Sequence, residues 1–496
     1  MTSDAVVRTA QGAISGEAQD GFTVFRGIPY AAPPIGALRW APPQPAALWS
    51  GERDATAEPP IAPQNPSRLA AVMGDFTGVQ SEDCLSLTVW RPEPARGPRP
   101  VLVWIHGGAF LTGAGALPWY AGDAYARSGL VVVALNYRLG ALGFLSVPGL
   151  SPGNLGLLDQ IAALGWVRKN IAAFGGDPQD VTVMGQSAGG GSIGALMAMP
   201  AARGLFKRAI LQSPALRRVN PSPEDAAQAG AEFLAILGVP ADQPVLARDV
   251  PVARILQAQS ELIRRRYGFA DPGHPFRPVR DPQVLPKTPV EAARDGELAG
   301  IDILIGTTRE EMAAFYSVDP SVRDADEATI LAEFTRLFDA RGPAVLAAYR
   351  RARLGARPSV ALADLYTDWL FALPCLELAE AQAAHGRPAY VYQFDWQSPG
   401  GFEACHCLEL PFVFDNFADW PNAPMLDGAD RETAGQLARI MQRAWAAFAL
   451  TGDPDHEALP HWAPYDLTRR ITMRFDTVVG PVGDLAGRTT ARERAG

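Results

Sequence analysis

The sequence has little cysteine, no long hydrophobic run and no excess of basic residues. Only four of its 496 residues are cysteines, at positions 84, 375, 405 and 407, which is too few for a disulfide framework. Its most apolar stretches, such as 101–105 and 130–135, are far shorter than the roughly 18 residues that a membrane-spanning helix needs. The polar start of the chain has neither the basic nor the apolar region of a signal peptide. These absences predict a cytoplasmic protein with free thiols and no membrane span.

The charge balance excludes another class of partner. The chain has 44 Lys and Arg residues against 53 Asp and Glu residues, a net charge of −9 and an isoelectric point near 5.3. A protein that binds nucleic acid or anionic lipid needs a basic surface to neutralise phosphates. We therefore expect a small-molecule partner and no nucleic acid.

Short β-branched and apolar runs alternate with longer helical patterns along the chain. The helical pattern is clearest over 157–174, where apolar residues recur every three or four positions. The apolar runs lie at 101–105, 130–135, 181–184, 209–211, 303–305 and 389–394. Continuous apolar strands that alternate with helices predict an α/β fold whose mostly parallel central sheet is covered by helices on both faces.

The domain organisation follows from the spread of turn residues. The 48 glycines and 44 prolines are distributed along the chain rather than gathered in a linker, so we predict one catalytic domain over 1–496. Two stretches without strand rhythm, about 216–300 and 318–386, are predicted to be helical insertions that cover the active-site cleft. The polar end at 487–496 is predicted to be frayed.

One serine has the surroundings of a nucleophile. Gly185-Gln186-Ser187-Ala188-Gly189 matches the G-x-S-x-G pattern, in which small neighbours permit a sharp strand-to-helix turn under the serine. A second match places Ser192 at its centre. Ser187 directly follows an apolar strand, whereas Ser192 would lie more than a turn inside the next helix. We therefore predict Ser187 as the nucleophile and Ser192 as a packing residue.

A serine that attacks acyl groups needs donors for the oxyanion and a base. The loop His106-Gly107-Gly108-Ala109-Phe110 follows the 101–105 strand and is typical of loops that present backbone N–H groups to an oxyanion, together with the N–H of Ala188. The expected chain order is serine, acid, histidine, which excludes His106 as the base. The other five histidines (274, 385, 406, 456 and 461) stay open, as does the acid, although Glu310 and Glu311 follow a strand closely.

With their neighbours, these motifs resemble the type-B carboxylesterase/lipase family of α/β-hydrolases, and in particular its bacterial para-nitrobenzyl-esterase-like members. The resemblance extends over nearly the whole chain. Its further segments, in family order, are Phe25-Arg26-Gly27-Ile28-Pro29-Tyr30-Ala31, Leu38-Arg39-Trp40, Ser81-Glu82-Asp83-Cys84-Leu85, Asn136-Tyr137-Arg138, Phe174-Gly175-Gly176-Asp177-Pro178, Asp364 to Pro374, and Thr451-Gly452-Asp453-Pro454.

The resemblance implies roles that the residues alone leave open. It implies that Glu311 is the triad acid and His406 the triad histidine, and that Gly108, Ala109 and Ala188 supply the oxyanion donors. It also implies a supporting role for Ser213 near the acid. Two positions depart from the family pattern. Met312 replaces a glycine after the acid, and Cys407 replaces a small residue after the histidine. The resemblance therefore does not fix the backbone conformation at these two positions.

Other features narrow the expected substrate. Secreted members pair the residue equivalent to Cys84 with an upstream cysteine that is absent here, which implies a free thiol. Gln186 and the lack of tryptophan in 65–83 disfavour choline esters.

A zinc site at Cys405-His406-Cys407 is not expected, because no second pair of ligands has suitable spacing. We interpret Arg264-Arg265-Arg266 as a solvated helix face, with contact to an anionic acyl group as the alternative.

The function that these residues imply is a serine carboxylesterase without cofactor or metal. It is expected to hydrolyse short- to medium-chain or aryl esters through an acyl-enzyme, as a monomer or small homo-oligomer. Hydrolysis of amides, lactones or lipids by the same residues is an alternative. A non-catalytic binding protein on the same fold is another, which the retention of Ser187, His406 and an acid disfavours.

Overall fold

A large central sheet organises the part of the chain that the computed structural model describes, residues 5–95, 97–218 and 221–485. Among these residues the sheet has eleven strands, in the spatial order β16-β15-β14-β13-β12-β11-β7-β8-β6-β4-β3. In chain order they are β3 (Glu17–Gln19), β4 (Phe22–Pro29), β6 (Ser86–Pro92), β7 (Arg99–Ile105), β8 (Val131–Leu135), β11 (Gly176–Gln186), β12 (Arg208–Gln212), β13 (Asp302–Thr308), β14 (Ala389–Phe394), β15 (Ile471–Phe475) and β16 (Gly480–Gly483). Smaller sheets are formed by β1 (Val6–Arg8), β2 (Ala13–Ser15) and β5 (Glu52–Asp54), and by β9 (Ser146–Val147) and β10 (Ser151–Pro152).

The middle of the central sheet is parallel and its margins are antiparallel. Neighbouring strands from β8 through β7, β11, β12, β13 and β14 to β15 all pair in parallel. Strands β16, β6, β4 and β3 pair antiparallel with their neighbours. This arrangement confirms the predicted α/β-hydrolase architecture with a mostly parallel sheet. In such a sheet the carboxyl ends of the parallel strands meet at one edge, where ligand sites form.

Successive residues of the central strands point to opposite faces of the sheet, and both faces are buried. In β7, Val101, Val103 and Ile105 belong to one hydrophobic cluster, whereas Leu102 and Trp104 belong to the other. The same division recurs in β8 and β13. Because side chains alternate across a strand, a strand that is covered on both faces must be apolar at every position. This explains the continuous apolar runs in the sequence.

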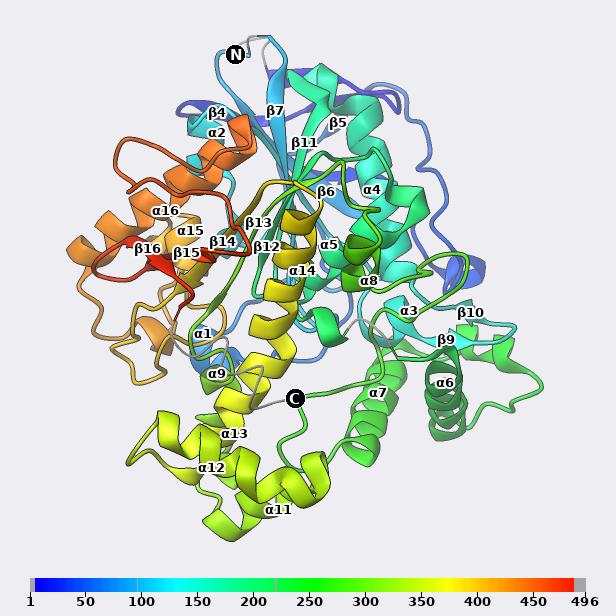
Figure 1. The fold of residues 1–496 in the computed structure, drawn as a ribbon. Coiled ribbons are helices and arrows are strands. Elements are labelled where there is room, and N and C mark those ends of the chain that lie inside the picture. The colour runs from blue at the N-terminus through cyan, green and yellow to red at the C-terminus, as the bar shows by residue number, and fades with distance from the viewer. Residues whose placement is uncertain (1–4, 96, 219–220, 486–496) are drawn as a thin grey trace.

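Helices cover both faces, and Figure 1 shows α16 on one side of the sheet and α4 and α8 on the other. The predicted helix at 157–174 is observed as α4 from residue 155 to 170, followed by a single 3₁₀ turn. In chain order the helices are α1 (Ala70–Met73), α2 (Asp123–Arg127), α3 (Gly140–Phe144), α4 (Leu155–Asn170), α5 (Ala188–Ala198), α6 (Pro223–Leu237), α7 (Val252–Arg266), α8 (Pro289–Arg294), α9 (Ala313–Tyr316), α10 (Pro320–Arg323), α11 (Glu327–Phe338), α12 (Gly342–Ala352), α13 (Pro358–Thr367), α14 (Leu373–Ala384), α15 (Leu410–Val413) and α16 (Arg431–Thr451).

The two stretches without strand rhythm are helical. Residues 216–300 contain α6, α7 and α8, and residues 318–386 contain α10 to α14. Figure 1 shows α11, α12 and α13 grouped at one end of the molecule, with α6 and α7 beside them. Helices α11 to α13 bury a hydrophobic cluster of their own, which includes Phe334, Tyr349 and Leu362. The predicted frayed end, 487–496, lies outside the described residues.

One helical segment is longer and more apolar than the sequence runs suggest. Helix α13, the π-helical turn Asp368–Ala372 and α14 join into a 27-residue segment, 358–384, that is long and apolar enough to span a membrane by length and composition. Its mean hydropathy is 1.2, and 67% of the apolar window is buried inside the protein. The segment was missed as an apolar run because polar residues such as Asp364 interrupt it. Its burial is that of a helix packed in the core.

A buried ion pair ties the sheet to helix α4. The guanidinium of Arg138 donates to both carboxylate oxygens of Asp159, at 2.8 and 2.7 Å. The side chains are only 4% and 0% exposed. The backbone N–H of Arg138 also donates to Asp159, and a third guanidinium bond reaches the carbonyl of Ala41. The pair therefore joins three segments that are distant in sequence.

We predict that Asp159→Asn destabilises the protein by about 3–5 kcal/mol, because it leaves the Arg138 charge buried without its partner. The free energy of unfolding in urea measures the effect. The control is Glu457→Gln, which breaks the exposed pair with Arg443 and should change stability by less than about 1 kcal/mol. Equal effects of the two substitutions would contradict the role given to the buried pair.

Candidate active site

A sharp turn places Ser187 above the carboxyl end of the central sheet. Strand β11 ends at Gln186 and helix α5 begins at Ala188, so Ser187 is the only residue between them. Its φ of 56° and ψ of −120° are rare for a residue with a side chain. Backbone hydrogen bonds hold this conformation, since Ser187 donates to Gln212 and accepts from Gly191, both at 2.8 Å. The turn holds the hydroxyl away from the strand and toward the pocket.

Small residues let the next loop approach this turn closely. A Cβ atom at Gly189 would lie 2.0 Å from the carbonyl oxygen of Ile105. One at Gly107 would lie 2.6 Å from the carbonyl oxygen of Gln186 and 3.1 Å from Cβ of Ser187. Neither position has space for a side chain. The glycines therefore allow the backbone after β7 to lie directly against the serine turn.

The structure brings three of the predicted residues into one hydrogen-bonded line. Nε2 of His406 lies 2.7 Å from Oγ of Ser187, and Nδ1 lies 2.5 Å from Oε2 of Glu311. The other carboxylate oxygen of Glu311 accepts from the backbone N–H of Thr308 at 2.9 Å. His406 and Glu311 are 1% and 0% exposed, and the rings of Phe315 and Phe371 pack against the imidazole. The carboxylate is thus oriented by the end of β13 and screened from water.

The competing residues take no part in this line of contacts. Ser192 is buried within α5, where its hydroxyl accepts a hydrogen bond from Gln160 at 3.1 Å. Glu310 points away from His406 and pairs with Arg353 and Arg309. His274 lines the same pocket as Ser187, whereas the side chains of His385, His456 and His461 contact backbone or carboxylate groups outside it.

The predicted oxyanion donors line the pocket beside Ser187. The backbone N–H groups of Gly108 and Ala109 have no hydrogen-bond acceptor among the described residues. Both residues have positive φ, 102° and 55°, and a Cβ at Gly108 would lie 2.1 Å from the carbonyl of Thr112. Ala188 is the first residue of α5, where N–H groups have no partner within the helix. Three backbone donors are therefore available at one place.

His106 supports this loop and is not basic enough to act as the proton acceptor. Burial lowers the pKa of His106 to about 4, so its imidazole is neutral at physiological pH. The ring stacks on Tyr137, with centroids 4.4 Å apart. The Tyr137 hydroxyl donates to the His106 carbonyl at 2.9 Å. These contacts fix the start of the 106–110 loop.

The two departures from the family pattern have different consequences. Met312 is in the right-handed helical region, with φ −78°, so glycine is not required there. Cys407 has φ 73°, in the left-handed region that favours glycine. Its Sγ lies 3.3 Å from the side-chain nitrogen of Gln186. The backbone after the histidine is therefore strained where the sequence departs from the family.

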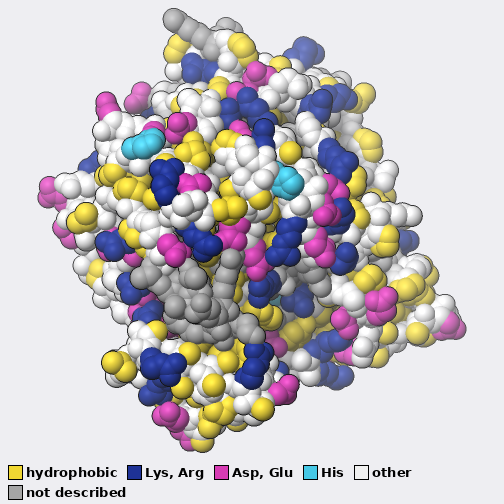
Figure 2. Space-filling view, in the orientation of Figure 1, with side chains coloured by type: hydrophobic (Ala, Val, Ile, Leu, Met, Phe, Trp, Pro, Cys, Tyr) yellow, Lys and Arg dark blue, Asp and Glu magenta, His cyan; other side chains and the backbone are white. Residues whose placement is uncertain are grey.

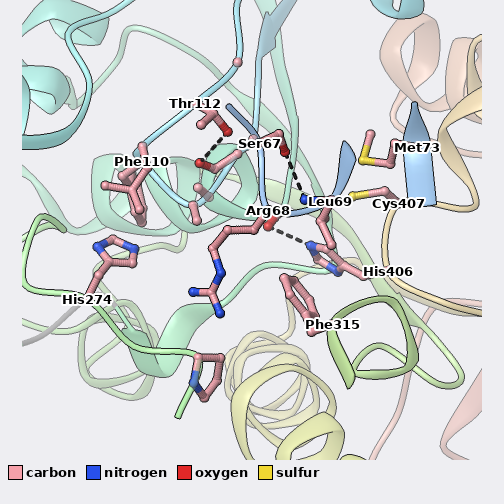
Figure 3. A pocket seen from close by; sticks show the side chains of 18 of the residues that line it. Ser67, Arg68, Leu69, Met73, Phe110, Thr112, His274, Phe315, His406 and Cys407 are labelled. Atoms are coloured by element: carbon pink, nitrogen blue, oxygen red, sulfur yellow. Dashed lines mark hydrogen bonds between the residues drawn. The ribbon is translucent and has the colours of Figure 1, made fainter. Parts of the chain in front are cut away.

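The pocket is a cavity of about 320 Å³ whose walls come from distant parts of the chain. Its lining includes apolar and aromatic residues such as Met73, Trp119 and Phe371. It also includes residues near the end of α7, together with His274 and Arg277 from the segment that follows. Figure 3 shows His274 across the cavity from Met73 and Cys407, with Arg68 extending into the space between. Both helical stretches therefore contribute residues to the pocket.

Sequence reasoning assigned no role to Glu409, which follows His406 by three residues. Its carboxyl is fully buried; Oε1 accepts from Gln212 at 3.3 Å, and Oε2 has no hydrogen-bond partner in the described structure. Burial, and secondarily the charge of Glu311, raises the pKa of Glu409 to about 7. Ser213 is also buried, and its hydroxyl has no partner among the described residues. The only sequence signal was the proximity of Glu409 to His406.

The sulfur atoms and acidic groups show no sign of metal binding in the described residues. No group of three or more His, Cys, Asp or Glu side chains there is arranged to hold a metal ion. All four cysteines are buried free thiols. Burial raises the pKa of the Cys84 thiol above its ordinary range, so this thiol stays protonated.

Comparison with known proteins identifies the family. The model of the carboxylesterase family matches residues 3–482. The chain belongs to the carboxylesterase family. It is 40% identical to the para-nitrobenzyl esterase of Bacillus subtilis (strain 168), over 96% of this chain and 95% of that protein. It is 39% identical to the phenmedipham hydrolase of Pseudarthrobacter oxydans, over 99% and 98% of the two chains. The solved structure of a thermophilic PNB esterase has a TM-score of 0.88 and 38% identity, with full coverage of both chains.

These relationships confirm the resemblance, the fold and the general activity that the sequence predicts. This carboxylesterase is an enzyme that hydrolyses carboxylic esters, and the alternatives of another hydrolase or a non-catalytic protein are not favoured. A triad and an oxyanion hole are typical of the family.

We predict that the raised pKa of Glu409 makes the enzyme less stable as pH increases. The folded protein holds this proton up to about pH 7, whereas the unfolded chain releases it near the ordinary value of 4.5, so stability falls as pH rises between these values. Glu409→Gln cannot ionise. The free energy of unfolding of Glu409→Gln minus that of wild type should therefore rise by about 2 kcal/mol from about pH 5 to about pH 8.

Urea unfolding of both proteins at the two pH values measures this difference. The matched control is Glu457→Gln, which removes a side chain that is 88% exposed and should leave the pH dependence unchanged. A Glu409→Gln profile parallel to wild type would show that Glu409 does not titrate as described.

Proposed function

We propose that this carboxylesterase cleaves its substrate through an acyl-enzyme formed on Ser187. The observation that supports this is the line of contacts from Ser187 Oγ through His406 to Glu311. Oγ attacks the ester carbonyl carbon while Nε2 of His406 accepts the hydroxyl proton. Glu311 holds the ring and stabilises the imidazolium. The imidazolium then returns the proton to the leaving alkoxide as the carbon–oxygen bond breaks.

The backbone N–H groups of Gly108, Ala109 and Ala188 are the proposed donors to the oxyanion. Support comes from their place in the pocket beside Ser187 and from the two N–H groups without acceptors. Donors of this kind contribute about 3 kcal/mol each to the transition state. In the second step, His406 removes a proton from water, the resulting hydroxide attacks the acyl carbon, and the acid leaves as Ser187 Oγ is reprotonated.

The pocket supports short- to medium-chain or aryl esters as substrates. Its volume of about 320 Å³ suits a small molecule. Aromatic residues such as Trp119, Tyr120 and Phe371 in its lining favour an apolar acyl chain or ring. The reaction as written needs no cofactor.

We further propose that 1–496 works as one catalytic domain in the cytoplasm, as a monomer or small homo-oligomer. The single-domain proposal is supported by the pocket, because segments from residue 65 to residue 407 share its lining. The cytoplasmic location is supported by the four free thiols, since reducing compartments keep cysteines unpaired.

A series of para-nitrophenyl esters from acetate to palmitate tests the nucleophile. We expect Ser187→Ala to lower kcat/KM by at least about 10⁴-fold, because no other group replaces the attacking oxygen. Release of para-nitrophenol at equal folded concentration is the readout. Ser192→Ala is the matched control and should retain activity. Full activity in Ser187→Ala would overturn the mechanism.

The two neighbouring glutamates provide a second test. Glu311→Gln should lower kcat by about 10³- to 10⁴-fold, because the amide favours the wrong imidazole tautomer and carries no charge. Glu310→Gln should change kcat by less than about tenfold, because Glu310 contacts Arg353 rather than His406. Steady-state kinetics on one ester compare them. The reverse ranking would show that the acid is misassigned.

A further inference from the structure

Three arginines line the pocket, and no carboxylate does. Arg68 lies before α1, Arg264 at the end of α7 and Arg277 in the segment that follows α7. The lining contains neither Asp nor Glu among the described residues. This is unusual in a chain with a net charge of −9. Figure 2 shows basic and acidic side chains interspersed over one outer face, whereas the charged side chains in the described pocket lining are all arginines.

None of these three arginines forms an ion pair with another described residue. Their neighbours on α7 behave differently, because Arg265 pairs with Glu261, and Arg266 pairs with Glu232 at 3.4 Å. The solvated-face interpretation of this basic run therefore holds for its second residue. Arg264 is exposed as well, but it also lines the pocket, because consecutive side chains of a helix point to different faces.

Arg277 is the most informative of the three. It is half-buried, and its buried Nε has no hydrogen-bond partner among the described residues. Burial lowers the pKa of Arg277, and the more distant Tyr267, Asp271 and Asp225 only partly oppose this effect. Arginine nevertheless stays charged. A partly desolvated charge without an ion-pair partner is unfavourable, and a bound anion would reduce that penalty.

We infer that the ester substrate of this enzyme carries an anionic group, of which a carboxylate is the simplest, and that Arg277, assisted by Arg68 and Arg264, binds it. The inference rests on the proposed hydrolysis at Ser187 and specifies its substrate class. Guanidinium groups bind carboxylates through paired, charge-assisted hydrogen bonds. The apolar wall around Met73 and Trp119 would take the hydrocarbon part of the same molecule.

Two matched pairs of esters test the inference on the acyl side and on the alcohol side. The acyl pair is mono-para-nitrophenyl adipate and para-nitrophenyl 6-methylheptanoate, in which a neutral isopropyl group replaces the carboxylate. The alcohol pair is 4-(carboxymethyl)phenyl butyrate and 4-isobutylphenyl butyrate. In at least one pair we expect the wild-type enzyme to favour the anionic ester by about tenfold in kcat/KM, mainly through KM.

Arg277→Gln should reduce that preference by about tenfold relative to wild type, and Arg277→Lys should retain part of it. Arg264→Gln replaces an exposed residue and should reduce the preference in the same direction, which keeps the test valid if Arg277→Gln does not fold. Arg265→Gln is the control, because Arg265 pairs with Glu261 and does not line the pocket. It should leave the preference unchanged.

The outcomes separate this inference from the proposed mechanism. Two outcomes would overturn the inference while leaving the mechanism intact, provided that Ser187 remains essential for the neutral esters. In the first, the wild-type enzyme shows no preference for the anionic ester in either pair. In the second, it shows a preference that both Arg277→Gln and Arg264→Gln leave intact. Turnover of the neutral esters that survives Ser187→Ala would overturn the mechanism itself. A preference lost in the pocket variants and kept in Arg265→Gln would support the inference.

Discussion

The active site depends on the close approach of two parallel strand ends. Strands β7 and β11 are in register up to Ile105 and Gly185, and the backbone then turns sharply at both. The carbonyl of Ile105 occupies the space that a side chain at position 189 would need. Because no side chain separates the two turns, the 106–110 loop and Ser187 lie side by side in the lining of the pocket. The next strands then deliver the remaining groups, since the loops after β13 and β14 pair through Glu310 and Cys405 and carry Glu311 and His406 into line.

The second constraint is electrostatic. Glu311 and Glu409 are both fully buried near His406, and two carboxylates of equal charge in a dry environment repel each other. Glu409 resolves this conflict by keeping its proton up to about pH 7.

Much of this arrangement is predictable from the sequence. The apolar runs mark the central strands because both faces of the sheet are covered, and context alone separates Ser187 from Ser192. Chain order left five histidines open and the acid unassigned among many carboxylates, because the partners meet only through loops that lie 95 residues apart. Family resemblance, rather than spacing, selected Glu311 and His406. The pocket walls were not predictable. Arg264 and Arg265 are adjacent and chemically identical, and only the orientation of α7 decides which of them faces the cavity.

This division between what was and was not predictable has a physical basis. The groups that carry the proposed chemistry come from loops at the edge of the sheet, where register and close packing leave little freedom. The arginines of the pocket come from segments outside the sheet, namely the loop before α1, the end of α7 and the residues after it. Helices that pack over a sheet tolerate changes in sequence that its central strands do not. Charge in the pocket can therefore be altered without moving Ser187, His406 or Glu311. Selectivity for an anionic ester would then be a property of the covering helices, and hydrolysis a property of the sheet.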